Sequence, residues 1–167
     1  MMKISEFSKK YETKKLSCED VNEIYDLCLT NPLYYDYCPP AATKESILED
    51  LSALPPNVTM EDKYFVGFFE KERMVAVMDL IDGYPEEKIV FIGFFMTDAS
   101  VQNKGLGSAI ISEVIDYLKS MYYLAIQLAW VKGNPQAEHF WLKNGFLAIK
   151  ETSSTAADHV ILAEKKL

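Results

Sequence analysis

Residues 91–121, FIGFFMTDASVQNKGLGSAIISEVIDYLKSM, are the segment that most constrains how this chain can fold. The segment opens with an apolar stretch typical of a buried strand and continues through a short polar loop. Apolar side chains then recur at helical spacing, with charged side chains on the opposite face, which predicts an amphipathic helix over residues 107–120. The sequence therefore predicts a strand, a glycine-bearing loop and a helix in direct succession.

The loop, residues 102–107, reads Gln-Asn-Lys-Gly-Leu-Gly. The N–H groups in the first turn of a helix have no partner within the helix, and the helix dipole adds about half a positive charge there. Gly105 and Gly107 lack the Cβ atoms that would hold a ligand away from the backbone. This arrangement favours binding of a phosphate or diphosphate group.

Three phosphate-binding motifs compete for this loop. A Walker A loop places its lysine after the last glycine, whereas Lys104 precedes Gly105. A dinucleotide fingerprint needs a third small residue where Ile110 stands, and an acid closing the next strand, which residues 123–131 lack. The third motif, Q/R-x-x-G-x-G/A, is matched at Gln102, Gly105 and Gly107. A surface turn that only caps a helix is the structural alternative.

A second motif follows downstream. Asn134 and Pro135 open a helix that ends at Trp141-Leu142-Lys143-Asn144-Gly145-Phe146. Asn at the N-cap, Pro in the first turn and Gly after the last turn are also ordinary helix punctuation. Taken with the first motif, however, this order and spacing resemble the GCN5-related N-acetyltransferase superfamily. The resemblance is clear from about residue 63 to residue 146.

The resemblance implies a single N-acetyltransferase domain over residues 1–167. Its fold is α/β, with a mixed, mostly antiparallel and twisted sheet flanked by helices. The fourth and fifth strands run parallel and splay apart to form a cofactor cleft. The implied activity is direct transfer of an acetyl group from acetyl-CoA to a primary amine of a small molecule or protein in a ternary complex. The alternative is a noncatalytic acetyl-CoA sensor with the same fold.

The resemblance also implies which residues bind acetyl-CoA. Main-chain groups at the end of the fourth strand are expected to pair with the pantetheine arm, and Asn134 to contact this arm from the other side. The loop is expected to hold the diphosphate. The strand residues are Phe95, Met96 and Thr97, and the loop residues are Gln102, Asn103, Lys104, Gly105, Leu106, Gly107 and Ser108.

One position departs from the family pattern. Members often have a tyrosine seven residues after the asparagine, proposed to protonate the departing thiolate, and here that residue is Trp141. An indole N–H donates a hydrogen bond but gives up no proton near neutral pH. Either another acid acts or coenzyme A leaves as the thiolate. Trp141 is therefore expected either beside the substrates or as a core residue.

No general base is evident from the sequence. Asp79 near the end of the third strand, and Asp82 and Tyr84 in the following turn, are the candidates, and each also suits a plain turn or solvated position. The tyrosine-rich loop Tyr34, Tyr35, Asp36, Tyr37 corresponds to the acceptor side of the family's site. Tyrosines suit a cationic or an aromatic amine, although they also suit a packed structural loop. The acids Asp36, Asp79 and Asp82 are expected to attract an ammonium group.

Composition excludes several classes of function. A net charge of −8 disfavours nonspecific nucleic-acid binding, and no apolar run approaches the ~18 residues of a membrane span. The odd number of cysteines and the polar N-terminus indicate a cytoplasmic protein, expected as a monomer or homodimer. No metal is expected, because His139 and His159 lack further ligands at suitable spacing.

The rest of the chain supplies the remaining elements. Ser17 and Asp20 have the spacing of a helix start, and paired apolar stretches around a charged turn predict a hairpin. The expected strands cover residues 11–16, 64–69, 74–81, 89–96, 123–131, 147–152 and 158–164, and the expected further helices cover residues 21–30, 43–54 and 135–143.

Overall fold

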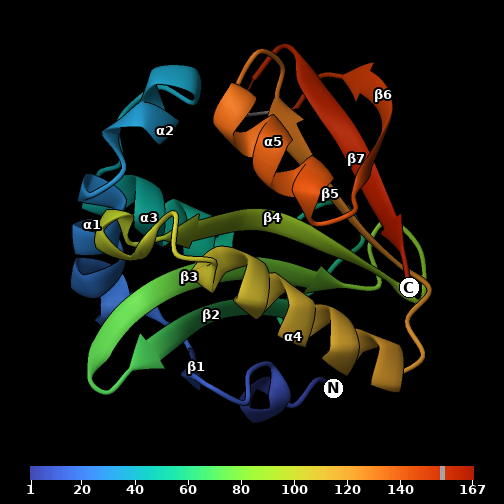
Figure 1. The fold of residues 1–167 in the computed structure, drawn as a ribbon, viewed down its shortest axis with the longest axis horizontal. Coiled ribbons are helices and arrows are strands. Elements are labelled where there is room, and N and C mark those ends of the chain that lie inside the picture. Colours follow the sequence, from blue (N-terminus) through green and yellow to red (C-terminus); the bar gives the residue numbers. More distant parts are fainter. Residues whose placement is uncertain (155–156) are drawn as a thin grey trace.

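The computed structural model describes residues 1–154 and 157–167. The strands form one sheet in the order β1-β2-β3-β4-β5-β7-β6, and helices cover both of its faces (Figure 1). The strands are β1 (Glu12–Lys15), β2 (Lys63–Glu70), β3 (Arg73–Asp82), β4 (Ile89–Thr97), β5 (Ala125–Val131), β6 (Leu147–Thr152) and β7 (Val160–Lys166). The helices are α1 (Val21–Leu29), α2 (Pro32–Tyr37), α3 (Lys44–Ser52), α4 (Leu106–Ser120) and α5 (Pro135–Lys143).

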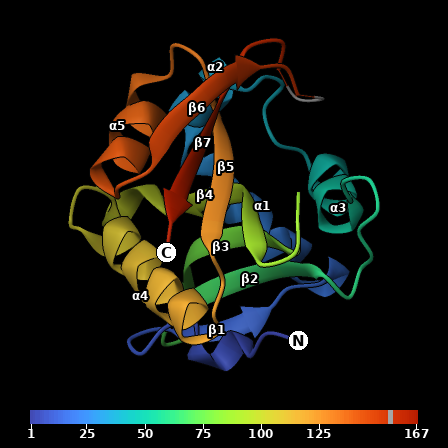
Figure 2. The same cartoon turned by 90° about the vertical axis from the view of Figure 1, so that its right-hand side faces the viewer.

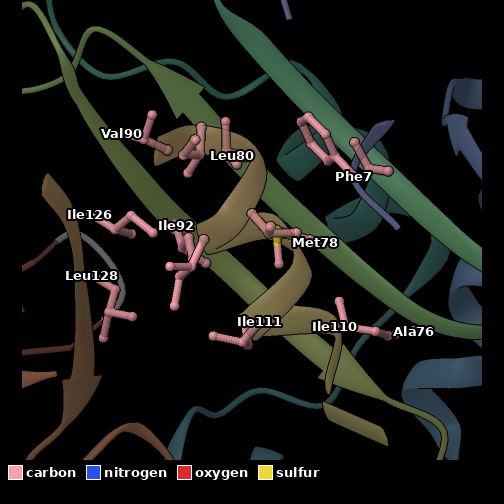
Figure 3. Packing of buried hydrophobic residues seen from close by; sticks show 14 of the residues in the cluster. Phe7, Ala76, Met78, Leu80, Val90, Ile92, Ile110, Ile111, Ile126 and Leu128 are labelled. Carbon is pink, nitrogen blue, oxygen red and sulfur yellow. The ribbon is translucent and has the colours of Figure 1, made fainter. Parts of the chain in front are cut away.

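The sheet separates two sets of helices. Figure 2 shows α4 and α5 on one side and α1 and α3 on the other. The apolar stripe of α4 packs on the first face, where Ile110 and Ile111 meet Met78 and Ile92 in the main core (Figure 3). A smaller cluster fills the second face beneath α1 and α3. Strands β2 and β3 are buried on both faces, so their sequences are almost continuously apolar.

The junction of β4 and β5 shapes the site. All other neighbouring strands are antiparallel, whereas β4 and β5 are parallel and pair only from Ile89↔Ala125 to Ile92↔Leu128. Beyond these pairs the two strands diverge, and β5 pairs on its other side with β7 along its whole length. Helix α4 is the crossover that parallel strands require. The predicted mixed sheet with splayed fourth and fifth strands is confirmed.

A bulge lies at this point of divergence. Asp79 of β3 pairs with Phe94 and Leu80 pairs with Ile92, so Gly93 of β4 is the extra residue. A Cβ atom at Gly93 would lie 3.0 Å from Oδ2 of Asp79, so glycine is the residue that fits there.

Some predicted boundaries change. The tyrosine-rich segment Tyr34–Tyr37, expected as a loop, lies within helix α2, which has Pro32 in its first turn, where the missing N–H costs nothing. The last strand begins at Val160 instead of residue 158. The cap-like start at Ser17 is found on a short 3-10 helix, Cys18–Asp20, that leads directly into α1: the Ser17 side chain accepts from Glu19 N–H, and the Asp20 side chain accepts from Ser17 N–H. No helix in the described part of the chain is long and apolar enough to cross a membrane.

Candidate active site

A cleft of about 590 Å³ lies where β4 and β5 diverge. Its walls come from residues 91–97 of β4, residues 128–131 of β5, the loop before α4, and one side of α5. Tyr34 and Cys38, at α2 and just after it, lie along another part of the wall. The cleft therefore joins both predicted motifs to the tyrosine-rich segment.

The start of α4 presents free main-chain donors to this cleft. Gly105 has φ +79°, a left-handed conformation that favours glycine, and nothing lies within 4 Å of the position its Cβ would take. The first hydrogen bond of the helix runs from Ala109 N–H to Gly105 O at 2.9 Å. The N–H groups of Leu106, Gly107 and Ser108 consequently have no partner within the helix. The 15-residue helix adds its dipole at the same place, so the loop fits an anionic group such as a diphosphate.

At position 107 the neighbouring side chains leave little room for anything larger than glycine. Its Cβ would lie 3.2 Å from Cε2 of Phe140 and 3.5 Å from Cγ2 of Thr97. A larger residue would press α5 away from the loop. The Asn144 side chain also donates to the Ser108 hydroxyl at 3.2 Å, which ties the end of α5 to the start of α4.

The Gln102 side chain points into the protein and braces the loop. Its Nε2 donates to Oδ1 of Asn31 at 2.6 Å and to the main-chain oxygen of Thr97 at 3.0 Å. Asn31 Nδ2 donates to the same Thr97 oxygen at 3.0 Å. Asn31, between α1 and α2, therefore links the loop to β4, a role that sequence reasoning missed because its position before Pro32 indicated only a helix boundary. Lys104 does not line the cleft, and its Nζ donates to Ser100 O at 3.0 Å.

The free edge of β4 also borders the cleft. Asp98 N–H donates to Val75 O, and main-chain groups alternate between the two edges of a strand. The main-chain N–H and C=O groups of Met96 therefore point to β3, whereas those of Phe95 and Thr97 point into the space where β4 and β5 diverge. Because the Thr97 oxygen already accepts from Asn31 and Gln102, Phe95 has the main-chain groups best placed for a ligand arm.

An aromatic cluster forms the wall of the cleft below α5. Phe140 stacks on Phe95 with ring centroids 5.8 Å apart, and Trp141 contacts Phe140 at 4.9 Å and Phe146 at 5.1 Å. Trp141 is buried, which matches the core alternative, and it also lines the cleft. Asn134, likewise buried and lining the cleft, caps α5 by accepting from Ala137 N–H at 3.2 Å.

Only one of the four residues in the tyrosine-rich segment lines the cleft. Tyr34 meets Phe94 edge to face, with centroids 5.7 Å apart. Burial raises the pKa of the Tyr34 hydroxyl, so it stays protonated at neutral pH. Tyr35 packs against Tyr34 at 5.0 Å from outside the cleft, and Asp36 is exposed. Tyr37 is half-buried and also lies outside the cleft lining.

The three candidate catalytic residues, Asp79, Asp82 and Tyr84, lie outside the cleft lining. Asp79 is paired with the buried Nζ of Lys63 at 2.8 Å, and its Oδ1 is buried without a hydrogen-bond partner. Burial raises the pKa of the Asp79 carboxyl. Asp82 accepts from Tyr123 OH at 2.7 Å, and Tyr84 packs on Phe91, both at the paired end of β4. Within residues 1–154 and 157–167, no three His, Cys, Asp or Glu side chains converge as a metal site requires.

Comparison with known proteins identifies the fold and family. The acetyltransferase (GNAT) family matches residues 19–146. No curated protein sequence matches the chain significantly. An acetyltransferase from Thermus thermophilus superposes with a TM-score of 0.80 at 18% identity, covering 95% of this chain and 97% of that one.

Two further solved structures are similar at lower TM-scores. The PaiA N-acetyltransferase from Thermoplasma acidophilum, in complex with coenzyme A, has a TM-score of 0.68 at 18% identity, covering 94% of this chain and 99% of that one. The ribosomal-protein-S18-alanine N-acetyltransferase from Escherichia coli has a TM-score of 0.68 at 13% identity, covering 93% of each chain. With the family match spanning residues 19–146 and both of its motifs facing one cleft, the chain belongs to the GNAT family of acetyltransferases.

Proposed function

We propose that this protein is a single-domain N-acetyltransferase that moves an acetyl group from acetyl-CoA directly to a primary amine in a ternary complex. One observation carries the proposal: a single cleft contains both the free N–H groups at the start of α4 and the open edge of β4. The first suits the diphosphate of acetyl-CoA, and the second suits an extended arm that pairs with a strand.

Within this proposal the cofactor end of the cleft has defined parts. The N–H groups of Leu106, Gly107 and Ser108 hold the diphosphate, with Asn103 and Gly105 shaping the loop through their positive φ angles. The pantetheine arm lies between the edge of β4 at Phe95 and the start of α5 at Asn134. The relative solved with coenzyme A has the same fold and supports this assignment. Acetyl-CoA supplies an acyl group already activated as a thioester.

Within this proposal, acetyl transfer needs little general acid or general base catalysis by the protein. Bond formation between the amine nitrogen and the thioester carbon, with cleavage of the carbon–sulfur bond, requires the two reactants to be held together and water kept out. The packed aromatic wall of Phe95, Phe140 and Trp141 serves both purposes. Trp141 does not protonate the leaving group, which departs as thiolate, a stable form for a thiol of pKa near ~8.5.

The diphosphate assignment is tested by two variants of equal size. Gly107→Gln and Gly107→Glu place nearly the same volume against Phe140, so any disturbance of α5 is common to both. Only the Glu variant adds a negative charge beside the diphosphate. We expect Gly107→Glu to bind acetyl-CoA at least about tenfold more weakly than Gly107→Gln in calorimetric titration, a difference of ~1.4 kcal/mol.

The comparison of the two variants decides whether the loop contacts the diphosphate. Equal affinities of the two folded variants, near that of the parent, would show that the loop does not contact the diphosphate. Circular dichroism and thermal unfolding of both variants establish that they fold. Release of free thiol in the presence of an amine then shows whether the bound acetyl-CoA is used.

The second candidate function is a noncatalytic acetyl-CoA sensor. Two observations favour a sensor. No carboxylate lines the described part of the cleft, and Trp141 stands where family members often carry a tyrosine. A sensor binds acetyl-CoA but releases no thiol with any amine.

For the enzyme, the proposed acceptor is a small-molecule amine or a protein amine, and relatives named for ribosomal-protein alanine acetylation illustrate the second class. Three unpaired cysteines support a cytoplasmic location.

A further inference from the structure

We propose that the acceptor is an aromatic amine whose nitrogen is already neutral at physiological pH, such as an arylamine. The inference rests on the proposed function and names the substrate class of the same site. It depends on the aromatic wall at the α2 side of the cleft and on the charges that face the cleft.

The acceptor end of the cleft has an aromatic wall. Tyr34 and Phe94 meet edge to face, at 5.7 Å and an interplanar angle of 83°, and both rings line the cleft. Tyr35 supports Tyr34 from behind at 5.0 Å, so the ring is held in place. The small residues Ala129 and Ala157 also line the cleft. A flat aromatic ring that lies against Tyr34 and Phe94 would gain edge-to-face or offset-stacked contacts.

The charges around the cleft disfavour a cation. Among the described lining residues the titratable side chains are Tyr34, Cys38, His139 and Lys143, and none of these is a carboxylate. Burial raises the pKa values of the Tyr34 hydroxyl and the Cys38 thiol, so both stay uncharged at neutral pH. An ammonium group entering this space loses hydration and makes no ion pair with a described side chain of the lining.

The nearest buried carboxylate does not change this balance. Asp79 lies behind the bulge at Gly93 and is paired with Lys63 at 2.8 Å. Asp50 of α3 interacts electrostatically with Lys63, Asp79 and Tyr34, but neither Asp50 nor Asp79 lines the cleft. Asp36 is exposed and outside the lining. This arrangement differs from the ammonium-binding group of Asp36, Asp79 and Asp82 that the sequence suggested.

A neutral acceptor also removes the need for a general base. The lone pair of the amine nitrogen attacks the thioester carbon, a C–N bond forms and the C–S bond breaks. The proton lost by the nitrogen balances the negative charge of the departing thiolate, giving the acetamide and free coenzyme A thiol. An amine that is protonated in solution must first lose a proton, and no cleft-lining carboxylate in the described part of the chain accepts it.

The test compares amines of different shape and basicity in a thiol-release assay with saturating acetyl-CoA. The amines are aniline, benzylamine, cyclohexylmethylamine and spermidine. We expect the highest kcat/KM for aniline, with no change between about pH 6.5 and about pH 8.5, because its nitrogen is neutral throughout. For the three protonated amines, kcat/KM should rise about tenfold per pH unit and level off only at the pKa of each amine.

Variants locate the acceptor. Tyr34→Leu and Phe94→Leu should each raise KM for aniline about threefold to tenfold, the effect expected of one aromatic contact, and leave KM for acetyl-CoA unchanged. Tyr122→Leu, at an exposed tyrosine between α4 and β5, is the matched control and should alter neither constant.

The possible contrary results distinguish failure of the aromatic-acceptor inference from failure of the proposed function. A best acceptor that is aliphatic or polycationic, or pH profiles that level off at one value shared by all amines, would overturn the aromatic-acceptor inference and leave the proposed function intact. Acetyl-CoA binding without thiol release from any of the four amines would overturn the inference and favour the sensor. Failure to bind acetyl-CoA would remove the proposed function itself.

Discussion

Replacing Lys63 by Met tests how much the buried ion pair between Lys63 and Asp79 contributes to the stability of the folded protein. The lysine side chain is 2% exposed and the Asp79 side chain 14% exposed, with Nζ and Oδ2 2.8 Å apart. Methionine keeps most of the side-chain length but leaves Asp79 buried and uncompensated. Removing one partner of such a pair costs about 3–5 kcal/mol of unfolding free energy, a large part of the ~5–15 kcal/mol typical of a domain.

The cost should depend on pH in a direction that the structure fixes. Burial already raises the pKa of Asp79 above its ordinary value, and the charge of Lys63 opposes this rise. Without Lys63 the folded-state pKa rises further, so the folded variant binds a proton that the unfolded chain does not. Stability of the variant then falls as pH increases through the window between the two pKa values. We therefore expect a smaller loss at about pH 5 than at about pH 8.

Urea unfolding followed by circular dichroism at both pH values measures these losses. Lys132→Met is the control, because it removes an exposed lysine paired with Glu151 and should cause no measurable change at either pH. Asp79→Leu added to Lys63→Met removes the stranded carboxyl and should recover most of the lost stability. A loss below about 1 kcal/mol for Lys63→Met, or an equal loss at both pH values, would refute the reasoning.

Three further predictions concern the site and its surroundings. Trp141→Phe should keep turnover within about tenfold and leave the pH profile unshifted, because general acid catalysis is normally worth about 10²-fold or more; a thousandfold loss with folding and acetyl-CoA affinity intact would contradict this. Asn31→Ala removes the hydrogen bonds to Thr97 and Gln102, so unfolding free energy should fall by about 1–3 kcal/mol and acetyl-CoA should bind more weakly, whereas unchanged binding would show that the loop needs no brace. Exposed Cys18 should react with iodoacetamide at about pH 7.5 well before Cys28, whose thiol is buried and has a raised pKa; mass spectrometry showing equal rates would contradict the packing around α1.

Local patterns predicted the parts of the fold that position the site. The stripe of apolar residues in α4, the glycines before it and the Asn134-Pro135 start of α5 are signals carried by neighbouring residues. Each specifies an element without reference to the rest of the chain. The resemblance then supplied the splay of β4 and β5, which the register of these strands confirms.

The missed features depend on contacts between distant parts of the sequence. Helix α2 has only six residues and too little periodicity to be recognised. The partners Asn31 and Gln102 are far apart in the chain, as are Lys63 and Asp79, so neither pair has a local signal. The charges of Asp36, Asp79 and Asp82 suggested an acceptor site, but none of the three side chains lines the cleft: Asp36 lies in α2, and Asp79 and Asp82 lie in β3. Strand order, the bulge at Gly93 and burial, which are not local sequence features, place these acids outside the cleft lining.

A crystal structure of the protein grown with coenzyme A tests the central claim most directly. The account predicts the diphosphate within hydrogen-bond distance of the N–H groups of Leu106, Gly107 and Ser108, and the pantetheine arm between Phe95 of β4 and Asn134 at the start of α5. Coenzyme A bound elsewhere on the surface, or with its diphosphate away from the start of α4, would contradict it.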